Sequence, residues 1–203
     1  PSVTSLDDGG FLITWFSVNT DNSGDYFGQR FDVNGATVGS EFQVSNNTQD
    51  NPVTSLADGG FVDIWVESSA DGTPTGQQSI LGQLFGANGG LNSPNFVIKV
   101  ATGEIGSSSV APLADKGFVV TWNENSGHGS FYSILGQRFD ANGSTIGSEF
   151  TIKSSVSSNQ GAGASFGSPT VIDLNDGSFV VTWDGYFDQV PSNSNPILGQ
   201  RFD

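Results

Sequence analysis

The side chains that could do acid and base chemistry in this chain are nearly all carboxylates. Asp63 and Glu67 lie four residues apart, and Asp184 and Asp188 repeat that spacing. Two carboxyl groups that meet in space can hydrolyse a glycosidic bond, one as the acid and the other as the base or nucleophile. These residues are therefore the candidates for cleavage of a glycan.

Asp63 is the most unusual of them because of its surroundings. It stands where the related segment FVVTW at 118–122 has a valine. On a strand it would share a face with Phe61 and Trp65, since alternate side chains point to the same side. A charge on such a face costs several kcal/mol unless it is paired or hydrated. Asp63 and Glu67 are accordingly candidates for ligand binding as well.

The only histidine, His128, lies in the glycine-rich segment NSGHGS, where we expect an exposed side chain. With one histidine and no cysteine, the chain cannot build a zinc cluster from these ligands. A Ser/His/Asp triad cannot recur in segments that lack histidine. His128 remains a candidate for ligand binding, together with Tyr132 and Tyr186.

The segment DNSGD at 21–25 offers oxygen ligands for a cation. Asp21, Ser23 and Asp25 lie on a glycine-containing loop, and Ca²⁺ prefers oxygen ligands of this kind. The spacing differs from that of an EF-hand loop, and a solvated turn would use the same residues. A solvated turn is therefore the first interpretation of this segment, and a Ca²⁺ site at Asp21, Ser23 and Asp25 is the alternative prediction.

The chain consists of four copies of one unit. The segments SLDDGGFLITW, SLADGGFVDIW, PLADKGFVVTW and DLNDGSFVVTW end at tryptophans 15, 65, 122 and 183. Self-similarity at such a period indicates a repeat architecture. Tryptophan rings can stack on sugars, but their identical positions at the ends of apolar strands favour core packing. The expected repeats are 1–51, 52–108, 109–168 and 169–203, the last lacking a strand.

Each copy carries the signals of two hairpins. One is an Asp-Gly turn before a segment such as FLITW, and the other is an Asn-Gly turn, as at 34–35 and 142–143. Together they give about four short strands per full copy and no helical period. The prediction is an all-β fold, a β-propeller-like array of four blade repeats. A β-sandwich or a stacked β-repeat would use the same strands and is the alternative.

A repeated arginine stands in the segment GQRFD, except in the second copy, which has Leu84 there. Residues two apart on a strand share a face, so each arginine should lie beside the aspartate that follows it. A glutamate after the second hairpin is present in the first and third copies, which have this arginine and aspartate, and it is absent from the second copy, which lacks both. This suggests that the three residues form one structural clasp, because a buried arginine needs a carboxylate partner. A ligand-anchoring arginine is the alternative. The expected clasp residues are Arg30, Asp32, Glu41, Arg138, Asp140, Glu149, Arg201 and Asp203.

The charge of the chain excludes several classes of partner. Six basic residues against 21 acidic ones give a net charge of -15, which repels nucleic acid and anionic membrane surfaces. The apolar runs are far shorter than the roughly 20 residues that cross a bilayer, so we expect no membrane insertion. Glycans, proteins and cations remain as partners.

The phrases DGGFVVTW, ILGQRFDANG and GSEF together resemble the tandem repeats of large secreted bacterial proteins, the RTX-like surface adhesins and calcium-binding proteins. The likeness covers all four copies. It implies a bacterial extracellular or cell-surface location, frequent calcium dependence and a role in adhesion.

The function expected from the sequence is a non-catalytic interaction module that binds a glycan or a protein through loops on one rim. The segments 16–26, 66–79, 123–133 and 184–196 vary in length and sequence while the strands do not, as a separate binding surface would. One alternative is a structural repeat or self-assembling subunit of an array, which implies self-association. A glycan-cleaving enzyme is the third hypothesis.

Overall fold

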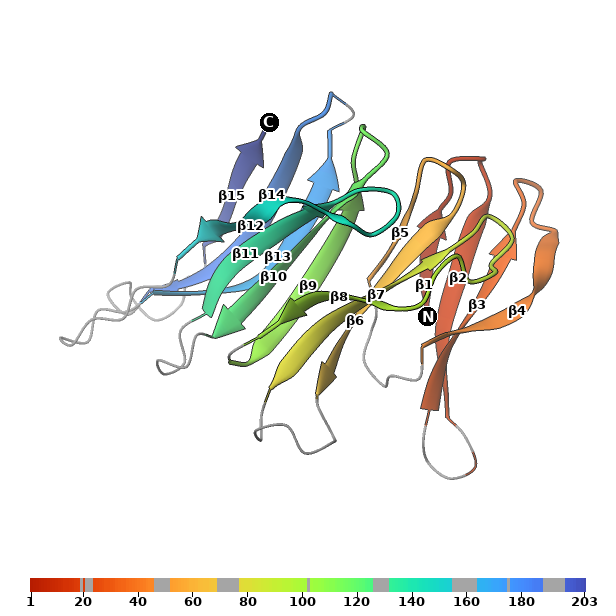
Figure 1. Ribbon diagram of the computed structural model, residues 1–203, viewed down its shortest axis with the longest axis horizontal. Helices are drawn as coiled ribbons and strands as arrows, with labels where there is room; N and C mark the ends of the chain where they lie inside the picture. Colours follow the sequence, from red (N-terminus) through yellow and green to blue (C-terminus); the bar gives the residue numbers. More distant parts are fainter. Residues whose placement is uncertain are drawn as a thin grey trace.

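In the computed structural model, the chain forms four antiparallel sheets that lie in a row along its length (Figure 1). The structure describes residues 1–18, 20, 24–45, 52–68, 77–101, 103–125, 132–154, 164–174, 176–187 and 196–203. Over these residues every regular element is a strand, which confirms the all-β prediction. The described part contains no helix long and apolar enough to cross a membrane.

Each sheet is a meander in which strands consecutive in sequence pair with one another. The first sheet contains β1 (Ser2–Ser5), β2 (Phe11–Val18), β3 (Gly24–Phe31) and β4 (Thr37–Ser45). The second contains β5 (Val53–Ser55), β6 (Phe61–Ser68), β7 (Gln78–Phe85) and β8 (Phe96–Val100). The third contains β9 (Ile105–Pro112), β10 (Phe118–Asn125), β11 (Tyr132–Phe139) and β12 (Thr145–Lys153). The fourth contains β13 (Ala164–Asp173), β14 (Phe179–Phe187) and β15 (Ile197–Phe202).

The sheets stack face to face with their first strands together. Strand β1 contacts β5, β5 contacts β9, and β9 contacts β13. The fourth strands, β4, β8 and β12, form the opposite edges of their sheets. Every inner sheet is therefore covered on both faces, and its strands must be apolar on both sides.

Strand β10 shows this burial most clearly. Phe118, Val120 and Trp122 point to one side and Val119 and Thr121 to the other, and all of them are fully buried. The sequence carries apolar residues on both faces of this strand because both faces pack against neighbouring sheets. The second and third sheets are thus each packed between two neighbouring sheets.

The repeated segment GQRF lies at the end of the third strand, where that strand pairs with the fourth in the first and third sheets. A Cβ on Gly136 would lie 2.7 Å from Cζ of Phe150, so only glycine leaves room for that ring. The side chain of Gln137 donates from Nε2 to the carbonyl oxygens of Arg138 and Ile146, at 2.9 and 3.1 Å. These bonds bridge the register shift between β11 and β12, where the ladder is interrupted.

The phenylalanines of each unit make a stack that the preceding sheet completes. In the third sheet Phe118 stacks on Phe139, with ring centroids 5.1 Å apart, and Phe96 from β8 packs against both rings. The same arrangement recurs where the first sheet meets the second and where the third meets the fourth. It consists there of Phe42 on Phe61 and Phe85, and of Phe150 on Phe179 and Phe202.

Candidate functional site

The repeated arginines bind aspartates in hairpin turns. Arg30 forms an ion pair with Asp8, and Arg138 donates from Nη2 to Oδ2 of Asp115 at 2.9 Å. In the fourth sheet Arg201 binds Asp176 in the same way, at 3.0 Å. Each of these aspartates also accepts, on Oδ1, the backbone N–H two residues ahead of it. One carboxylate thus shapes the turn and ties it to the third strand.

These partners differ from the ones that strand spacing suggests for Arg30 and Arg138. Asp32 and Asp140 come directly after their strands end, so the alternation of a strand no longer applies to them. Their Oδ1 atoms accept hydrogen bonds from the second turn instead, from Asn34 and Ala36 in the first sheet and from the matching residues in the third. Only Arg201 keeps the expected neighbour, with Nε 3.5 Å from Oδ1 of Asp203.

The glutamates expected in the clasp lie apart from the arginines. Glu149 binds Lys99 of the preceding sheet, with its Oε2 2.7 Å from Nζ. Glu41 is exposed on β4. The structure thus has two separate kinds of ion pair in place of the single expected clasp. Each arginine binds an aspartate of its own sheet, whereas Glu149 binds a lysine of the neighbouring sheet.

Lys99 covers a tryptophan between the second and third sheets. Its Nζ lies 5.7 Å from the ring centroid of Trp122 and 3.2 Å from Oε2 of Glu124. Desolvation lowers the pKa of Lys99, but its hydrogen bonds to Glu149 and Glu124 outweigh this and raise the pKa above the ordinary value. The side chain is therefore a fixed cation that fills the space over the ring.

The matching place between the first and second sheets is open. The fourth strands align as EFQVS, NFVIK and EFTIK, so Ser45 stands where the other copies have Lys99 and Lys153. A short hydroxyl replaces a long cation, and a groove of about 230 Å³ remains beside Trp65. We call it the Trp65 groove, and it is lined by Gln43, Val44, Ser45, Trp65, Gln83, Leu91 and Asn95.

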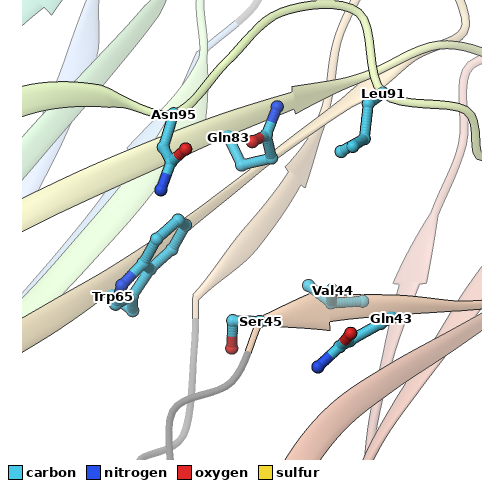
Figure 2. A pocket seen from close by; sticks show the side chains of 7 residues that line it. All are labelled: Gln43, Val44, Ser45, Trp65, Gln83, Leu91 and Asn95. Atoms are coloured by element: carbon cyan, nitrogen blue, oxygen red, sulfur yellow. The ribbon is translucent and has the colours of Figure 1, made fainter.

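The two sides of the Trp65 groove come from different sheets. Figure 2 shows Gln83, Asn95 and Leu91 along one side, with the end of β4 facing them. Trp65, from β6, closes one end. The Nε2 donors of Gln83 are used by the carbonyl oxygens of Leu84 and Ser93, which leaves its Oε1 to accept a bond from a ligand. The lining carries amides, a hydroxyl and an indole but no formal charge.

Asp63 lies next to this groove, on the same strand as Trp65 and opposite Gln83 of the neighbouring strand. It pairs in register with Gln83, and it is fully buried on the strand face that it shares with Trp65. Glu67, near the end of the same strand, is exposed. Asp184 lies on β14 in the fourth sheet, and the third sheet stands between it and Asp63 (Figure 1). Asp63 and Asp184 are therefore not brought together, and Asp188 is outside the described residues.

The remaining predicted residues are scattered. Tyr132 donates from Oη to Oε2 of Glu104 at 2.5 Å, and this bond raises the pKa of the tyrosine. Tyr186 belongs to β14, but its side chain lies outside the described part, as does His128. Tyr132 is not among the residues that line the Trp65 groove.

The calcium prediction rests partly on residues that the structure does not describe. Asp25 is half-buried on β3, while Asp21 and Ser23 fall outside the described ranges. Within those ranges, no group of three or more histidines and carboxylates is placed to hold a metal ion. The Ca²⁺ site therefore stays a prediction.

The residues that sequence reasoning missed are the polar ones that line the groove, Gln43, Ser45, Gln83 and Asn95. A signal for them was present in the alignment of the fourth strands. Ser45 and Asn95 are the positions at which one copy departs from the lysine and glutamate of the others. All four tryptophans occupy the same position in their repeats, so the sequence position of Trp65 does not distinguish it from the other three.

Comparison with known proteins gives a structural likeness alone. No family model matches the chain, and no curated protein matches it. Among solved structures, the chain is similar to the α-L-arabinofuranosidase Arb93A from Fusarium graminearum, determined with an iminosugar inhibitor. The TM-score is 0.52 at 14% identity, over 94% of this chain and 59% of that chain. That protein is a β-propeller-like glycosidase, so the likeness supports the all-β repeat fold. The chain spans less than two thirds of its length.

Proposed function

We propose that the chain is a non-catalytic carbohydrate-binding module whose four sheets are blades of a β-propeller. The contacts between successive first strands support the blade arrangement, because the first strands of propeller blades lie around the central channel. The similarity to Arb93A supports both the fold and a carbohydrate ligand. The resemblance of the repeats to secreted bacterial adhesins suggests an extracellular or cell-surface setting.

The replacement of lysine by Ser45 is the observation that carries the proposal. It leaves a groove lined by two glutamines, an asparagine and Trp65, which is 6% exposed, in place of a salt bridge. An aromatic ring packs against the C–H face of a sugar, and amides bind its hydroxyl groups as donors and acceptors. Aromatic rings and a few polar side chains also line many small-molecule sites, where the polar groups fix the orientation of the ligand.

The groove favours an uncharged sugar, and its size allows only a short part of a glycan to enter. Its lining carries no formal charge, and the net charge of -15 repels sulfated or carboxylated chains. Its volume of about 230 Å³ is below the roughly 300–1,000 Å³ of sites that enclose drug-sized ligands. We expect one or two sugar residues to enter it, with the rest of the glycan outside.

The positions of the carboxylates favour binding over cleavage. Hydrolysis needs two carboxyl groups about 5 to 9.5 Å apart on either side of the bond. Asp63 is fully buried beside the groove, and the side chains that line the groove include no carboxylate. The proposed module therefore holds a glycan without acting on it.

A glycan array tests this function, using three forms of the protein. Wild type should bind neutral glycans, and Ser45→Lys should lose at least tenfold in affinity because the lysine fills the groove as Lys99 does. Ser148→Lys is the matched control, since it adds the same charge at an exposed position on β12. Equal binding by all three forms would contradict the proposed site.

Catalysis is tested on the glycan that binds best. Incubation with wild type should release no sugar. Release that is abolished in the double variant Asp63→Asn with Glu67→Gln would replace the binding proposal with the enzyme hypothesis.

A further inference from the structure

The two ends of the row of sheets expose faces that are buried everywhere else. On the first sheet, Phe11, Ile13, Trp15 and Phe31 are only half-buried. We call these four residues the leading face. Their counterparts in the third sheet are fully buried under the second sheet: Phe118, Val120, Trp122 and Phe139. The leading face thus has the composition of an inner junction, but none of the described sheets of this chain lies against it.

The fourth sheet exposes the other half of the same junction. Ile172 is 54% exposed and Leu174 is 36% exposed, while Val180 is half-buried. We call these three residues the trailing face. The residues at the same register in the third sheet are Ala111, Leu113 and Val119, which are at most 5% exposed. A neighbouring sheet covers them there, whereas no described strand of this chain covers the trailing face.

We propose that a second copy of this chain binds head to tail, with its leading face on the trailing face of the first. The argument is one of continuity, since the chain itself makes this type of junction three times between successive sheets. Both faces are apolar, and the leading face is also aromatic, so their burial would be favourable at about 25 cal/mol per Å². The glycan groove lies between the first two sheets, so this contact does not involve it.

The contact joins two different faces, which fixes its symmetry. A head-to-tail contact closes into a ring if the rotation allows it, and otherwise grows into a filament. Among the described strands, none pairs with β15 in the place of β4, β8 and β12, so no ring like that of Phe42 covers Phe11 and Phe31 in this contact, and it should be weaker than the inner junctions. The charge of -15 on each copy opposes association, so salt should strengthen it.

Sedimentation velocity over a hundredfold range of concentration tests the proposal. The mean mass of the wild-type protein should rise with concentration, and rise further with added salt. A monomer at every concentration and every salt level would overturn it. Mass that falls with salt would also overturn it, since charge and not apolar surface would then drive association.

Two charge variants test which faces meet. Ile13→Asp removes the leading face and Val180→Asp removes the trailing face, so each variant should be monomeric at all concentrations. An equimolar mixture should form a dimer that grows no further, because each variant keeps the face that the other lacks. Failure of the mixture to associate would overturn the head-to-tail arrangement.

A milder variant covers the case in which a charged one fails to fold. Ile172→Ser and Leu174→Ser together alter exposed side chains only, and the double variant should also stay monomeric. Ser148→Lys should associate like the wild type. Loss of association in Ser148→Lys as well would contradict the assignment to the end faces.

Discussion

Lys116 occupies a turn position that glycine holds in the three other copies. Its φ is 73°, close to the 83°, 81° and 91° of Gly9, Gly59 and Gly177. This left-handed conformation is unfavourable for a residue with a Cβ atom, by about 1–2 kcal/mol. Lys116 keeps it because Asp115 fixes the turn through the N–H of Gly117 and its carboxylate binds Arg138.

Replacement of Lys116 by glycine should therefore stabilise the protein. The relief of strain exceeds the extra freedom of glycine in the unfolded chain, and we expect a gain of about 0.5–1 kcal/mol in the free energy of unfolding. Urea denaturation measures it. Lys116→Ala is the control and should gain less, since alanine keeps the strain. An equal gain in both variants would attribute the effect to the lost charge.

Asp32 gives a prediction about pH. The backbone N–H of Ala36 is the largest cause that lowers its pKa below the ordinary 3.8, with Asn34 adding to it. A carboxyl group with a lowered folded pKa stabilises the protein above its unfolded pKa, and this contribution is lost as the pH falls through the folded pKa. Asp32→Asn should be less stable than wild type at pH 6, and the two should converge below pH 3.8 in thermal melts. A constant difference down to pH 2 would contradict the assignment.

At the scale of the elements, strands and turns follow from local sequence and the arginine ties do not. The Asn-Gly pairs predict turns with positive φ, and Gly35 and Gly143 have φ of 82° and 80°. The partner of Arg138, by contrast, is Asp115, 23 residues earlier on another hairpin. Spacing within one strand cannot identify a partner on the neighbouring turn.

The groove could be predicted from sequence only in part. Its cause, serine in place of lysine at the end of the fourth strand, is readable in EFQVS against NFVIK and EFTIK. Its effect is not, because Lys99 covers a tryptophan of the next sheet rather than one of its own. The packing of successive sheets decides which tryptophan lies beside an altered residue.

Lys99 also holds two sheets together, which gives a prediction at this scale. Lys99→Ser should cost about 3 kcal/mol of unfolding free energy, because the buried carboxylate of Glu124 loses its ion pair. Adding Glu124→Gln should recover part of the loss, since the amide carries no charge. Denaturant titration of both variants checks this. A double variant less stable than Lys99→Ser would contradict the account.

At the scale of the whole molecule, four similar sheets use one junction three times and differ where function is proposed. The stacks of Phe42, Phe96 and Phe150 on the following sheets make a uniform scaffold. The second sheet departs from it at Asp63, Leu84 and Asn95, and the first departs at Ser45. Ser45 and Asn95 line the Trp65 groove and Asp63 lies beside it, whereas Leu84 packs on the opposite face of the second sheet against the third. Three of the four departures thus gather at the proposed site.

The most direct test of this account is a glycan titration followed by NMR of the indole N–H groups. The four tryptophans give four such signals, and Trp65→Phe identifies the one from the groove. With the best glycan from the array, we expect the Trp65 signal to shift in a saturable way while the Trp15, Trp122 and Trp183 signals stay in place. A saturable shift of another indole without Trp65, or no shift at all under conditions of binding, would contradict the Trp65 groove as the binding site.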